Sequence, residues 1–555
     1  MRKKLVSILV SMALVCSTIM VSTSTIQAST TTDQTFQELN QKQIVKAMGP
    51  GWNLGNQLES VIDKVPEETN WGNPKITEAL IKRVKKAGFR SVRIPVSYFS
   101  KIDDNNQYKI DEKWLARVQE VVDYCVKNDL YAVINIHGDG YNSMDGWLLC
   151  NGDNQATIRK KYRKVWKQIA TRFKDYDEHL LFESMNEEFD GNYSGPKKEY
   201  YENINKYNQI FVDTVRKTGG NNKKRWLIIP GWNTNIDHTV GDYGFQIPTD
   251  NYRAKSIPKK QQRIMISVHY YEPWDFCGGE NSVTTQWGNE ATDASKTGPS
   301  CGEEYLQRQF KRLKKAFVNK GYPVFVGEYG AIDKSTYDAQ SEFYRAYFVQ
   351  KVCEASKANG CIPMYWDNGY NGVHGFGLFD RTTNTITQPA IIDAIMEGYG
   401  RNVKKHTQMM SVKLYASDSY YWYTVQSDNV ARITKKGGTY TLKLRGNKEM
   451  LSNLTTISLR DYYVERGKET MSPFKTADVV INKVVFNGNE YQVKENKTSA
   501  ITTEQGNFKM ELINQWSEAE PMITGLQKKE SFSFAQSQYK EENVLEVTFT
   551  VSNLS

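Results

Sequence analysis

Two glutamates are the side chains of this sequence best suited to chemistry. Glu187 follows Asn186 in the segment MNEE, and Glu328 stands much later in the segment GEYG. Cleavage of a glycosidic bond needs one carboxyl group to protonate the leaving oxygen and a second to meet the positive charge at the anomeric carbon. In a retaining mechanism the two carboxyl groups lie about 5 to 5.5 Å apart. A fold that brings these glutamates together would therefore supply this chemistry.

Other polar residues suggest how two identical side chains could take different roles. We expect Asn186 to bond a sugar 2-hydroxyl, and Tyr271 to hold Glu328 ionised and oriented. A positive neighbour such as Arg93 lowers the pKa of a carboxyl group. A carboxyl group with a raised pKa can then act as the acid while its partner, with a lowered pKa, stays ionised. The further candidates for substrate binding and support are Asn56, His137, Trp232, His269 and Trp366.

Aromatic residues are the unusual feature of the composition, with 33 Tyr and 12 Trp among 555 residues. Flat rings pack cores, but they also stack on sugar faces. Six tryptophans are candidate stacking platforms, and half of them are expected to be core residues: Trp52, Trp71, Trp147, Trp232, Trp274 and Trp366. Trp366 is the strongest candidate, because it ends the last apolar run beneath the expected cleavage point.

The chain from about residue 50 to 400 repeats one unit: a short apolar run, a polar loop and an amphipathic helix. Helical patterns such as 76–87, 114–128 and 305–320 have apolar residues at i, i+3 and i+4, and Gly88 and Gly219 follow helix ends, where a left-handed cap is wanted. The eight apolar runs are residues 51–58, 91–98, 131–138, 180–188, 226–233, 264–273, 323–331 and 361–369.

Apolar strands that alternate with helices predict a parallel sheet covered on both faces. Eight such units predict an α/β protein with a (β/α)₈ TIM barrel. A doubly wound open sheet is the alternative, but no Gly-rich phosphate loop follows the first strand. The barrel gathers the carboxyl ends of its strands at one face, where active sites lie. Each candidate residue alone has a structural explanation, but their convergence on that face predicts an active site.

The chain after Gly400 changes character. Residues 401–408 (RNVKKHTQ) read as a polar linker, and alternating strands such as 439–444 and 544–551 follow. Asn487-Gly488 between apolar runs is a two-residue hairpin signal. These features predict an all-β sandwich, so the expected domains are a signal peptide (1–28), a catalytic barrel (29–400) and a β-sandwich (401–555).

Two readings of this sandwich stay open, a carbohydrate-binding module and a purely structural or barrel-supporting one. Side chains alternate between the faces of a strand, so about half of the aromatic residues belong to the core. The outward ones would form a flat face for sugars. The residues concerned are Tyr420, Tyr421, Trp422, Tyr423, Tyr462, Tyr463 and Trp516.

The first residues predict export. Arg2, Lys3 and Lys4 precede an apolar run and a cleavage point near Ala28, a pattern typical of a secretory signal and too short and interrupted for a membrane span. Cleavage lowers the formal charge from +9 to +6, and the remaining charges are dispersed, which argues against a nucleic-acid partner.

Six cysteines remain after cleavage: Cys125, Cys150, Cys277, Cys301, Cys353 and Cys361. Export permits disulfides, and Cys277 with Cys301 would close one long loop. Cys125 falls on a helical pattern and is expected to be buried. No C-x-x-C spacing occurs, which argues against structural zinc.

Seven motifs, GWNLGNQLE, RIPVS, NIHGD, MNEE, HYYEP, GEYG and WDNG, stand in an order and spacing that closely resembles glycoside hydrolase family 5 over about residues 40–400. The resemblance implies Glu187 as acid/base and Glu328 as nucleophile, with no cofactor and no metal. The segment 68–74 (ETNWGNP) resembles the subfamily that holds endoglucanases, lichenases and xyloglucan-cleaving enzymes. The resemblance also assigns a set of residues around the cleavage point: Arg93, His137, Asn186, His269, Tyr271 and Trp366.

The chain departs from the family's pattern at one position. Many members carry a second histidine after the one at His137, where this chain has Gly138. The missing ring puts the substrate preference in question, though not the mechanism. The following insertion, residues 139–152 with Trp147, is expected to reshape the same region.

The expected protein is a secreted, monomeric, retaining endo-β-1,4-glucanase whose partner is a β-glucan polysaccharide, with no nucleic acid and no membrane after signal cleavage. Cellulose, mixed-linkage glucan, xyloglucan and mannan stay open as substrates. One alternative is a metal-dependent barrel hydrolase that uses His137, Asp139 and His269 as ligands. Another is a non-catalytic polysaccharide-binding protein that keeps the barrel as a scaffold.

Overall fold

The structure is a computed structural model that describes residues 36–258, 262–298, 300–338, 340–406, 409–418, 424–461, 474–494 and 508–555. The expected signal peptide and the aromatic residues Tyr420, Tyr421, Trp422, Tyr423, Tyr462 and Tyr463 lie outside these ranges. Within them, every helix is too short or too polar to cross a membrane.

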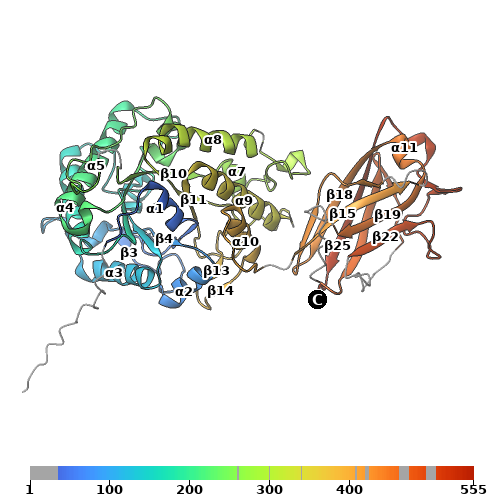
Figure 1. The fold of residues 1–555 in the computed structure, drawn as a ribbon, viewed down its shortest axis with the longest axis horizontal. Helices are drawn as coiled ribbons and strands as arrows, with labels where there is room; N and C mark the ends of the chain where they lie inside the picture. Colours follow the sequence, from blue (N-terminus) through green and yellow to red (C-terminus); the bar gives the residue numbers. More distant parts are fainter. Residues whose placement is uncertain are drawn as a thin grey trace, which may run out of the picture. The chain divides into compact units, whose positions relative to one another are not determined.

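Eight parallel strands close into a barrel in the spatial order β1-β12-β11-β10-β9-β8-β7-β4 (Figure 1). Each strand falls within one of the eight predicted runs, so the TIM barrel is confirmed and the open sheet is excluded. The strands are β1 (Gly51–Asn53), β4 (Ser91–Ile94), β7 (Tyr131–Ile134), β8 (Leu180–Glu183), β9 (Leu227–Pro230), β10 (Ile264–Tyr270), β11 (Val324–Tyr329) and β12 (Cys361–Tyr365).

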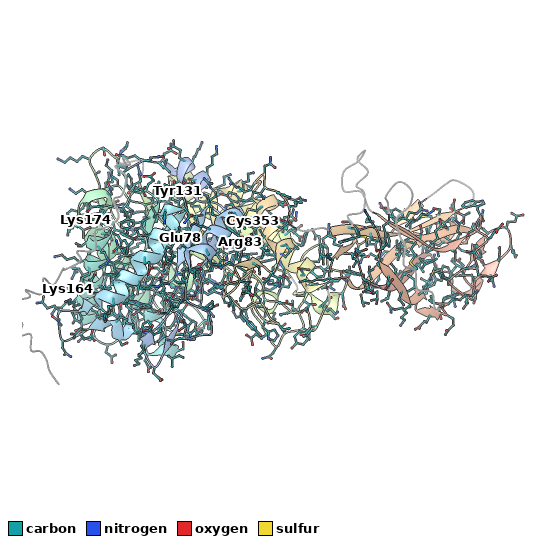
Figure 2. All side chains as sticks on the ribbon, turned by 90° about the horizontal axis from the view of Figure 1, so that it is seen from below. Glu78, Arg83, Tyr131, Lys164, Lys174 and Cys353 are labelled. Carbon is teal, nitrogen blue, oxygen red and sulfur yellow. The ribbon has the colours of Figure 1, made fainter. Side chains whose placement is uncertain are left out.

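Helices surround the barrel and turn their charged side chains outward. Figure 2 shows Glu78 and Arg83 of α2 and Lys164 of α4 on this layer. Gly88 and Gly219 follow α2 and α5 with φ of 110° and 80°, as predicted. The helices are α2 (Glu78–Lys86), α3 (Glu112–Lys127), α4 (Gln155–Arg172), α5 (Lys198–Lys217), α6 (Ile236–Val240), α7 (Trp274–Cys277), α8 (Glu303–Ala316), α9 (Ser341–Asn359) and α10 (Pro389–Gly398).

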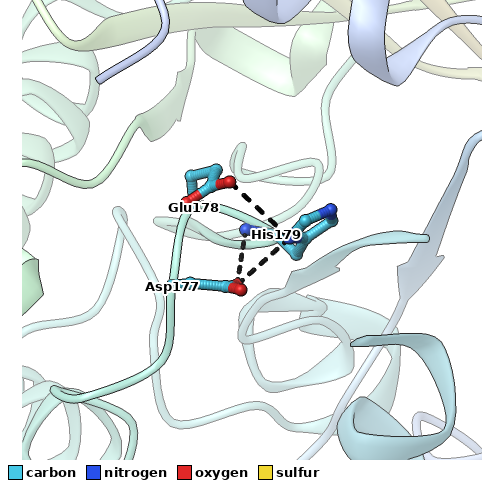
Figure 3. Close-up of side chains that lie close together, drawn as sticks. All are labelled: Asp177, Glu178 and His179. Carbon is cyan, nitrogen blue, oxygen red and sulfur yellow. Dashed lines mark hydrogen bonds and ion pairs between the residues drawn. The ribbon is translucent and has the colours of Figure 1, made fainter. Parts of the chain in front are cut away.

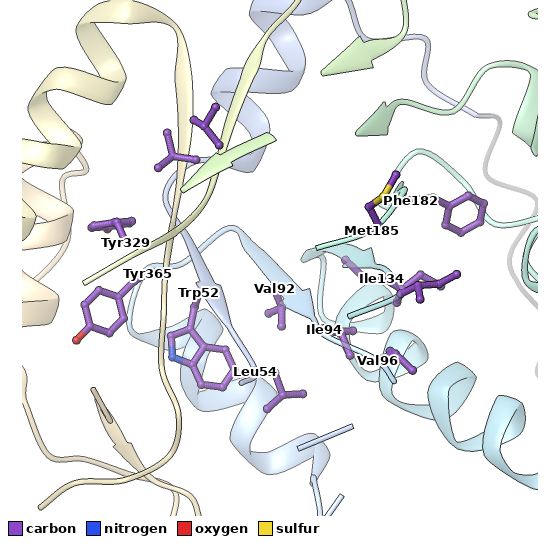
Figure 4. Close-up of a cluster of buried hydrophobic side chains, with 14 of the residues drawn as sticks. Trp52, Leu54, Val92, Ile94, Val96, Ile134, Phe182, Met185, Tyr329 and Tyr365 are labelled. Carbon is purple, nitrogen blue, oxygen red and sulfur yellow. The ribbon is translucent and has the colours of Figure 1, made fainter. Parts of the chain in front are cut away.

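Side chains alternate along each barrel strand because successive residues of a strand point to opposite faces. The outward residues pack against the helices; Figure 4 shows Val92 and Ile94 of β4 and Ile134 of β7 in this core. The inward residues form a separate apolar cluster that includes Ile44 and Met48 of helix α1 (Gln41–Met48). This helix therefore closes the amino-terminal end of the barrel, and the opposite end is left for the site.

Three short hairpins lie in loops that follow barrel strands. They are β2 (Val61–Ile62) with β3 (Val65–Pro66), β5 (Ile102–Asp103) with β6 (Lys109–Ile110), and β13 (Phe379–Asp380) with β14 (Thr385–Ile386). The first two lie in the connections from β1 to β4 and from β4 to β7.

The C-terminal region contains two antiparallel sheets, and buried residues of both sheets share one core. Asn487 and Gly488 form the predicted two-residue turn, with φ of 50° and 88°. One sheet holds β15 (Met409–Asp418), β16 (Thr424–Gln426), β17 (Ala431–Thr434), β19 (Leu454–Asp461), β22 (Lys509–Asn514), β23 (Gln527–Lys528) and β24 (Phe532–Ser533); the other holds β18 (Gly438–Asn447), β20 (Asp478–Phe486), β21 (Asn489–Tyr491) and β25 (Glu542–Ser552); α11 (Lys448–Leu451) follows β18.

The cysteines of the described residues are all free thiols. The suggested disulfide between Cys277 and Cys301 is therefore wrong for this structure. Cys125 is buried on α3, as predicted. The loop between β10 and α8 is held instead by non-covalent contacts, including a hydrogen bond from the Trp287 indole to the Cys301 carbonyl at 2.8 Å.

Candidate active site

The two glutamates meet at the carboxyl-terminal face of the barrel. Glu187 follows β8 and Glu328 lies on β11, on strands separated by β9 and β10. One carboxylate oxygen of each lies within 4.8 Å of the other. His269 stands beside both, with Nδ1 2.6 Å from Glu187 Oε1 and 3.6 Å from Glu328 Oε2. This spacing suits direct attack on a sugar, since an inverting pair is separated by about 6.5 Å or more.

Arg93, on strand β4, binds several polar side chains at the base of this site. Its side chain has no exposed surface, and its NH1 donates to Glu328 Oε1 at 2.8 Å and to Asn53 Oδ1 at 3.0 Å. Its NH2 donates to Asn186 Oδ1 at 2.6 Å. One guanidinium thus fixes the orientation of both the Glu328 carboxylate and the Asn186 amide, using the rigid fork of donors that only arginine offers.

Glu183 is a third carboxylate of the site that the sequence reasoning missed. It is fully buried on β8, and its Oε2 accepts from Arg93 Nε at 2.7 Å and from Asn135 Nδ2 at 3.0 Å, while Oε1 accepts from Ser267 Oγ at 2.8 Å. The signal was present, because a charged residue inside the apolar run LLFE must either pair or disrupt the core.

The ionisation of the site differs from the expectation. Burial raises the pKa of Glu328 above its ordinary value, although His269 and Arg93 lower it. The expected low pKa at Glu328 is therefore wrong for this structure, because desolvation outweighs the positive neighbours. Tyr271 still contacts this carboxylate as expected, donating to Glu328 Oε2 at 3.1 Å.

His137 is a neutral, fixed side chain. Burial, Arg93 and His269 hold its pKa well below the ordinary value. Asn135 donates through Nδ2 to His137 Nδ1 at 3.2 Å, and this amide cannot be reversed because its Oδ1 accepts from the backbone N–H of Val96 at 3.1 Å. The imidazole proton therefore resides on Nε2.

Trp366 forms an aromatic wall beside His137, directly after the carboxyl end of β12. It is partly exposed, and its indole lies nearly parallel to the His137 ring, at 11° with centroids 6.1 Å apart. Buried Asp367 holds this segment: its Oδ2 accepts from Trp52 Nε1 and from the Leu378 N–H, both at 2.9 Å, and its Oδ1 accepts from Arg381 at 3.1 Å. Trp366 is thus positioned by a rigid network beneath it.

The other five candidate aromatic platforms differ in their exposure. Trp52 and Trp232 have 0% and 1% of their surface exposed, so they belong to the half expected in the core and are not available for stacking on sugars. Trp71 and Trp274 are 38% and 60% exposed and remain available. Trp147 is partly buried and donates to Asp139 Oδ1 at 2.6 Å.

Asn56 contributes through its backbone. Its φ of 58° puts it in the left-handed region, its N–H donates to Glu59, and its carbonyl accepts from Asn73 Nδ2 at 2.9 Å. The residue therefore shapes the loop after β1 that packs against Trp366.

The structure argues against the metal set proposed from the sequence. Asp139 is buried, and its two oxygens accept from the backbone N–H groups of Tyr98 and Phe99 at 2.9 and 2.7 Å and from Trp147. Its carboxylate is thus committed to the fold and cannot join His137 and His269 as a ligand.

Two clusters of the described residues are compact enough for a cation. One is the pair of site glutamates with His269. The other, Asp177, Glu178 and His179, precedes β8 at the opposite end of the barrel (Figure 3), and His179 Nδ1 lies 3.2 Å from Asp177 Oδ1 and 3.9 Å from Glu178 Oε1. Its groups pair with one another, and Glu178 also accepts from the Gln37 N–H at 2.7 Å.

Comparison with known proteins gives a consistent answer. The family model described as cellulase (glycosyl hydrolase family 5) matches residues 58–372, more than half of the chain. Endoglucanase A of Paenibacillus barcinonensis is 57% identical over 364 residues, which span 65% of this chain and 91% of that protein.

Solved structures agree with this match. A family 5 xyloglucanase from Paenibacillus pabuli is 58% identical with a TM-score of 0.63, covering 64% of this chain and all of that one. A broad-specificity endoglucanase from Bacteroides salanitronis is 36% identical with a TM-score of 0.61, covering 66% of this chain and 98% of that one. The chain therefore belongs to glycosyl hydrolase family 5 and is a glycoside hydrolase.

Proposed function

We propose that this protein is a secreted, retaining endo-β-1,4-glucanase in which Glu187 is the acid/base and Glu328 the nucleophile. The observation that carries the proposal is the approach of these two carboxylates to within 4.8 Å beside His269. Secretion is supported by the basic and apolar pattern of residues 1–28.

The proposed reaction has two steps. Glu187 protonates the leaving oxygen while Glu328 attacks the anomeric carbon, which gives a covalent glycosyl ester at Glu328. Glu187 then removes a proton from the incoming water, which releases the sugar with its configuration retained. Arg93 and Tyr271 orient the attacking carboxylate through their bonds at 2.8 and 3.1 Å.

The proposed substrates are unbranched and xylose-branched β-1,4-glucans. The relative that is 57% identical is named an endoglucanase, and the structure that is 58% identical is named a xyloglucanase. A side-by-side assay on cellulose, mixed-linkage glucan, xyloglucan and mannan tests this assignment, with product anomers followed by NMR. Initial release of the α-anomer would contradict retention.

The proposal also assigns residues 29–400 to catalysis and residues 401–555 to polysaccharide binding. The second assignment is supported by Trp516, a residue that is 65% exposed. An exposed tryptophan offers a flat apolar face at little entropic cost, which suits stacking on sugar rings.

Glu187→Gln and Glu328→Gln test the catalytic roles. Each should lower kcat/KM on a soluble glucan by about 10³-fold or more, because general acid catalysis and nucleophilic attack are each lost. With an aryl cellobioside of good leaving group, E187Q should accumulate a glycosyl-enzyme visible by mass spectrometry and E328Q should not. The control is Glu178→Gln, at the other end of the barrel, which should keep its activity. Either site variant retaining a tenth of the wild-type rate would refute the proposal.

The two alternatives have their own readouts. Exhaustive chelation should leave activity intact, whereas loss that zinc restores would support a metal-dependent hydrolase. Release of new reducing ends from a soluble glucan would exclude a non-catalytic binding protein.

A further inference from the structure

Tyr141 is a side chain at the reaction site that the proposed mechanism does not use. Its hydroxyl accepts a hydrogen bond from Asn186 Nδ2 at 2.6 Å, and its ring stands edge-on to His137 with centroids 6.0 Å apart. It comes from the segment 139–152 rather than from a barrel strand.

The direction of the bond to Tyr141 follows from the chemistry of its neighbours. Arg93 can only donate, so the oxygen of the Asn186 amide must face it, at 2.6 Å from NH2. The Asn186 NH₂ group must then face Tyr141, whose oxygen accepts. Among the described residues, no side chain or carbonyl within hydrogen-bond distance accepts the proton of the Tyr141 hydroxyl in turn. The phenol is therefore left with a donor to offer.

This donor keeps its proton at any working pH. Burial raises the pKa of Tyr141 well above the ordinary value, and Glu187 and Glu328 raise it further. The influence of both carboxylates places the hydroxyl within the electrostatic reach of the reaction site. The residue also keeps part of its surface exposed, so a sugar can reach it.

The segment that carries Tyr141 is held rigidly by two buried carboxylates. Asp139 binds two backbone N–H groups of the loop after β4, and Glu188, which follows Glu187, accepts from the Cys150 N–H at 2.7 Å. The carbonyl of Tyr141 accepts from the Gly146 N–H at 3.0 Å. A hydroxyl held by such a frame is preorganised, which lowers the entropic cost of using it.

Side chains at positions 138 and 140, just before Tyr141, would crowd their neighbours. A Cβ at Gly138 would lie 2.8 Å from Ser97 Oγ, and one at Gly140 would clash with the Glu188 carboxylate. A ring at position 138 would therefore displace the hydrogen bond from the Gly138 N–H to Ser97 Oγ at 3.0 Å. Here Tyr141 supplies the polar group on this side of Asn186.

We propose that Tyr141 is a further substrate-contacting residue, which donates its hydroxyl proton to the 2-hydroxyl oxygen of the sugar that Glu328 attacks. Asn186 has a second amide proton that can be donated to the same sugar hydroxyl, so both residues bind this hydroxyl. This inference rests on the proposed function, because it assumes that Glu328 attacks a sugar at this position.

The test compares Tyr141→Phe with wild type on an aryl β-cellobioside and on its analogue that lacks the 2-hydroxyl of the sugar being cleaved. Loss of a hydrogen bond that strengthens in the transition state should lower kcat/KM about 10- to 30-fold on the first substrate. On the deoxy analogue the variant should match wild type within about twofold. The matched control is Tyr124→Phe, which removes a hydroxyl bonded to Glu120 on the surface of α3 and should leave both rates unchanged.

The outcomes separate the two proposals. An unchanged rate for Y141F, or an equal loss on both substrates, would overturn the contact, since the phenol would then be idle or would act only by placing Asn186. Failure of the proposed function would show differently, because the wild-type protein itself would not cleave the parent glycoside.

Discussion

Replacing Glu183 with Gln removes a charge from the barrel interior and leaves the shape of the site almost unchanged. The oxygen that faces the two donors Arg93 and Asn135 can become the amide oxygen of glutamine. The NH₂ group of the glutamine then takes the place of Oε1, which lies 2.8 Å from Ser267 Oγ in the wild-type protein. The Ser267 hydroxyl oxygen can accept a hydrogen bond from this NH₂ group. All three hydrogen bonds survive in this arrangement, so the effect of the substitution is electrostatic.

The cost in stability follows from the contact between Glu183 and Arg93. Two unit charges about 4 Å apart at an effective dielectric constant of about 20 attract by about 4 kcal/mol. Burying one charge fewer returns part of that energy, and Arg93 keeps Glu328 as a partner at 2.8 Å. We expect the free energy of unfolding to fall by about 3 kcal/mol, at the low end for a broken buried ion pair.

The effect on the chemistry has a definite sign. Glu183 and Glu328 contact different nitrogens of one guanidinium, Nε and NH1, and two carboxylates at a separation of about 7 Å repel by about 2 kcal/mol at the same dielectric constant. Removing Glu183 therefore favours the ionised form of Glu328 and lowers its pKa, by about 1.5 units since a unit corresponds to about 1.4 kcal/mol. The acidic limb of the kcat/KM profile should move to lower pH by that amount.

The assay is the pH dependence of kcat/KM on an aryl cellobioside, together with urea unfolding. The control is Glu68→Gln, which breaks a separate, partly buried pair with Arg117 at 2.9 Å. It should also reduce stability but leave the acidic limb in place. An acidic limb of E183Q that stays within 0.3 unit of wild type (about 0.4 kcal/mol), or that moves upward, would refute this reasoning.

Two further predictions concern the support of Trp366 and the pH dependence of stability. Asp367→Asn should lower the free energy of unfolding by about 3 to 5 kcal/mol and raise KM, because an amide cannot accept from all the donors that Asp367 binds. A loss of stability below about 1 kcal/mol in urea unfolding would contradict this prediction. Burial raises the pKa of Glu59 to about 7, so its stabilising contribution is complete below pH 4.5 and should be lost, by about 3 kcal/mol, as the pH rises through 7. A flat difference between wild type and Glu59→Gln over this range would show that Glu59 does not titrate there.

Much of the fold follows from local patterns in the sequence. The eight barrel strands lie inside the eight predicted apolar runs, because a strand buried on both faces needs an uninterrupted apolar sequence. The turn at Asn487-Gly488 was equally predictable, since both positions require positive φ. The suggested Cys277–Cys301 disulfide is absent, and this could not be predicted, because spacing in sequence carries no information on the distance between two thiols.

The site was predicted in part. Strand-end position was enough to bring Glu187, His269 and Glu328 together, because a barrel gathers the carboxyl ends of its strands. The same rule did not distinguish the core tryptophans Trp52 and Trp232 from the exposed ones, since it fixes the end of the strand at which a residue lies and not the side to which it points.

The residue types and their order determined by themselves that this chain forms a barrel with two glutamates at one mouth. Periodicity and strand-end position depend on residues that are neighbours in the chain, so they can be recognised in the amino-acid sequence. Only the tertiary structure decided that Glu183 shares Arg93 with Glu328, that burial raises the pKa of Glu328, and that Tyr141 reaches Asn186 from an inserted segment. Each of these depends on the distance between groups remote in sequence and on the water excluded between them.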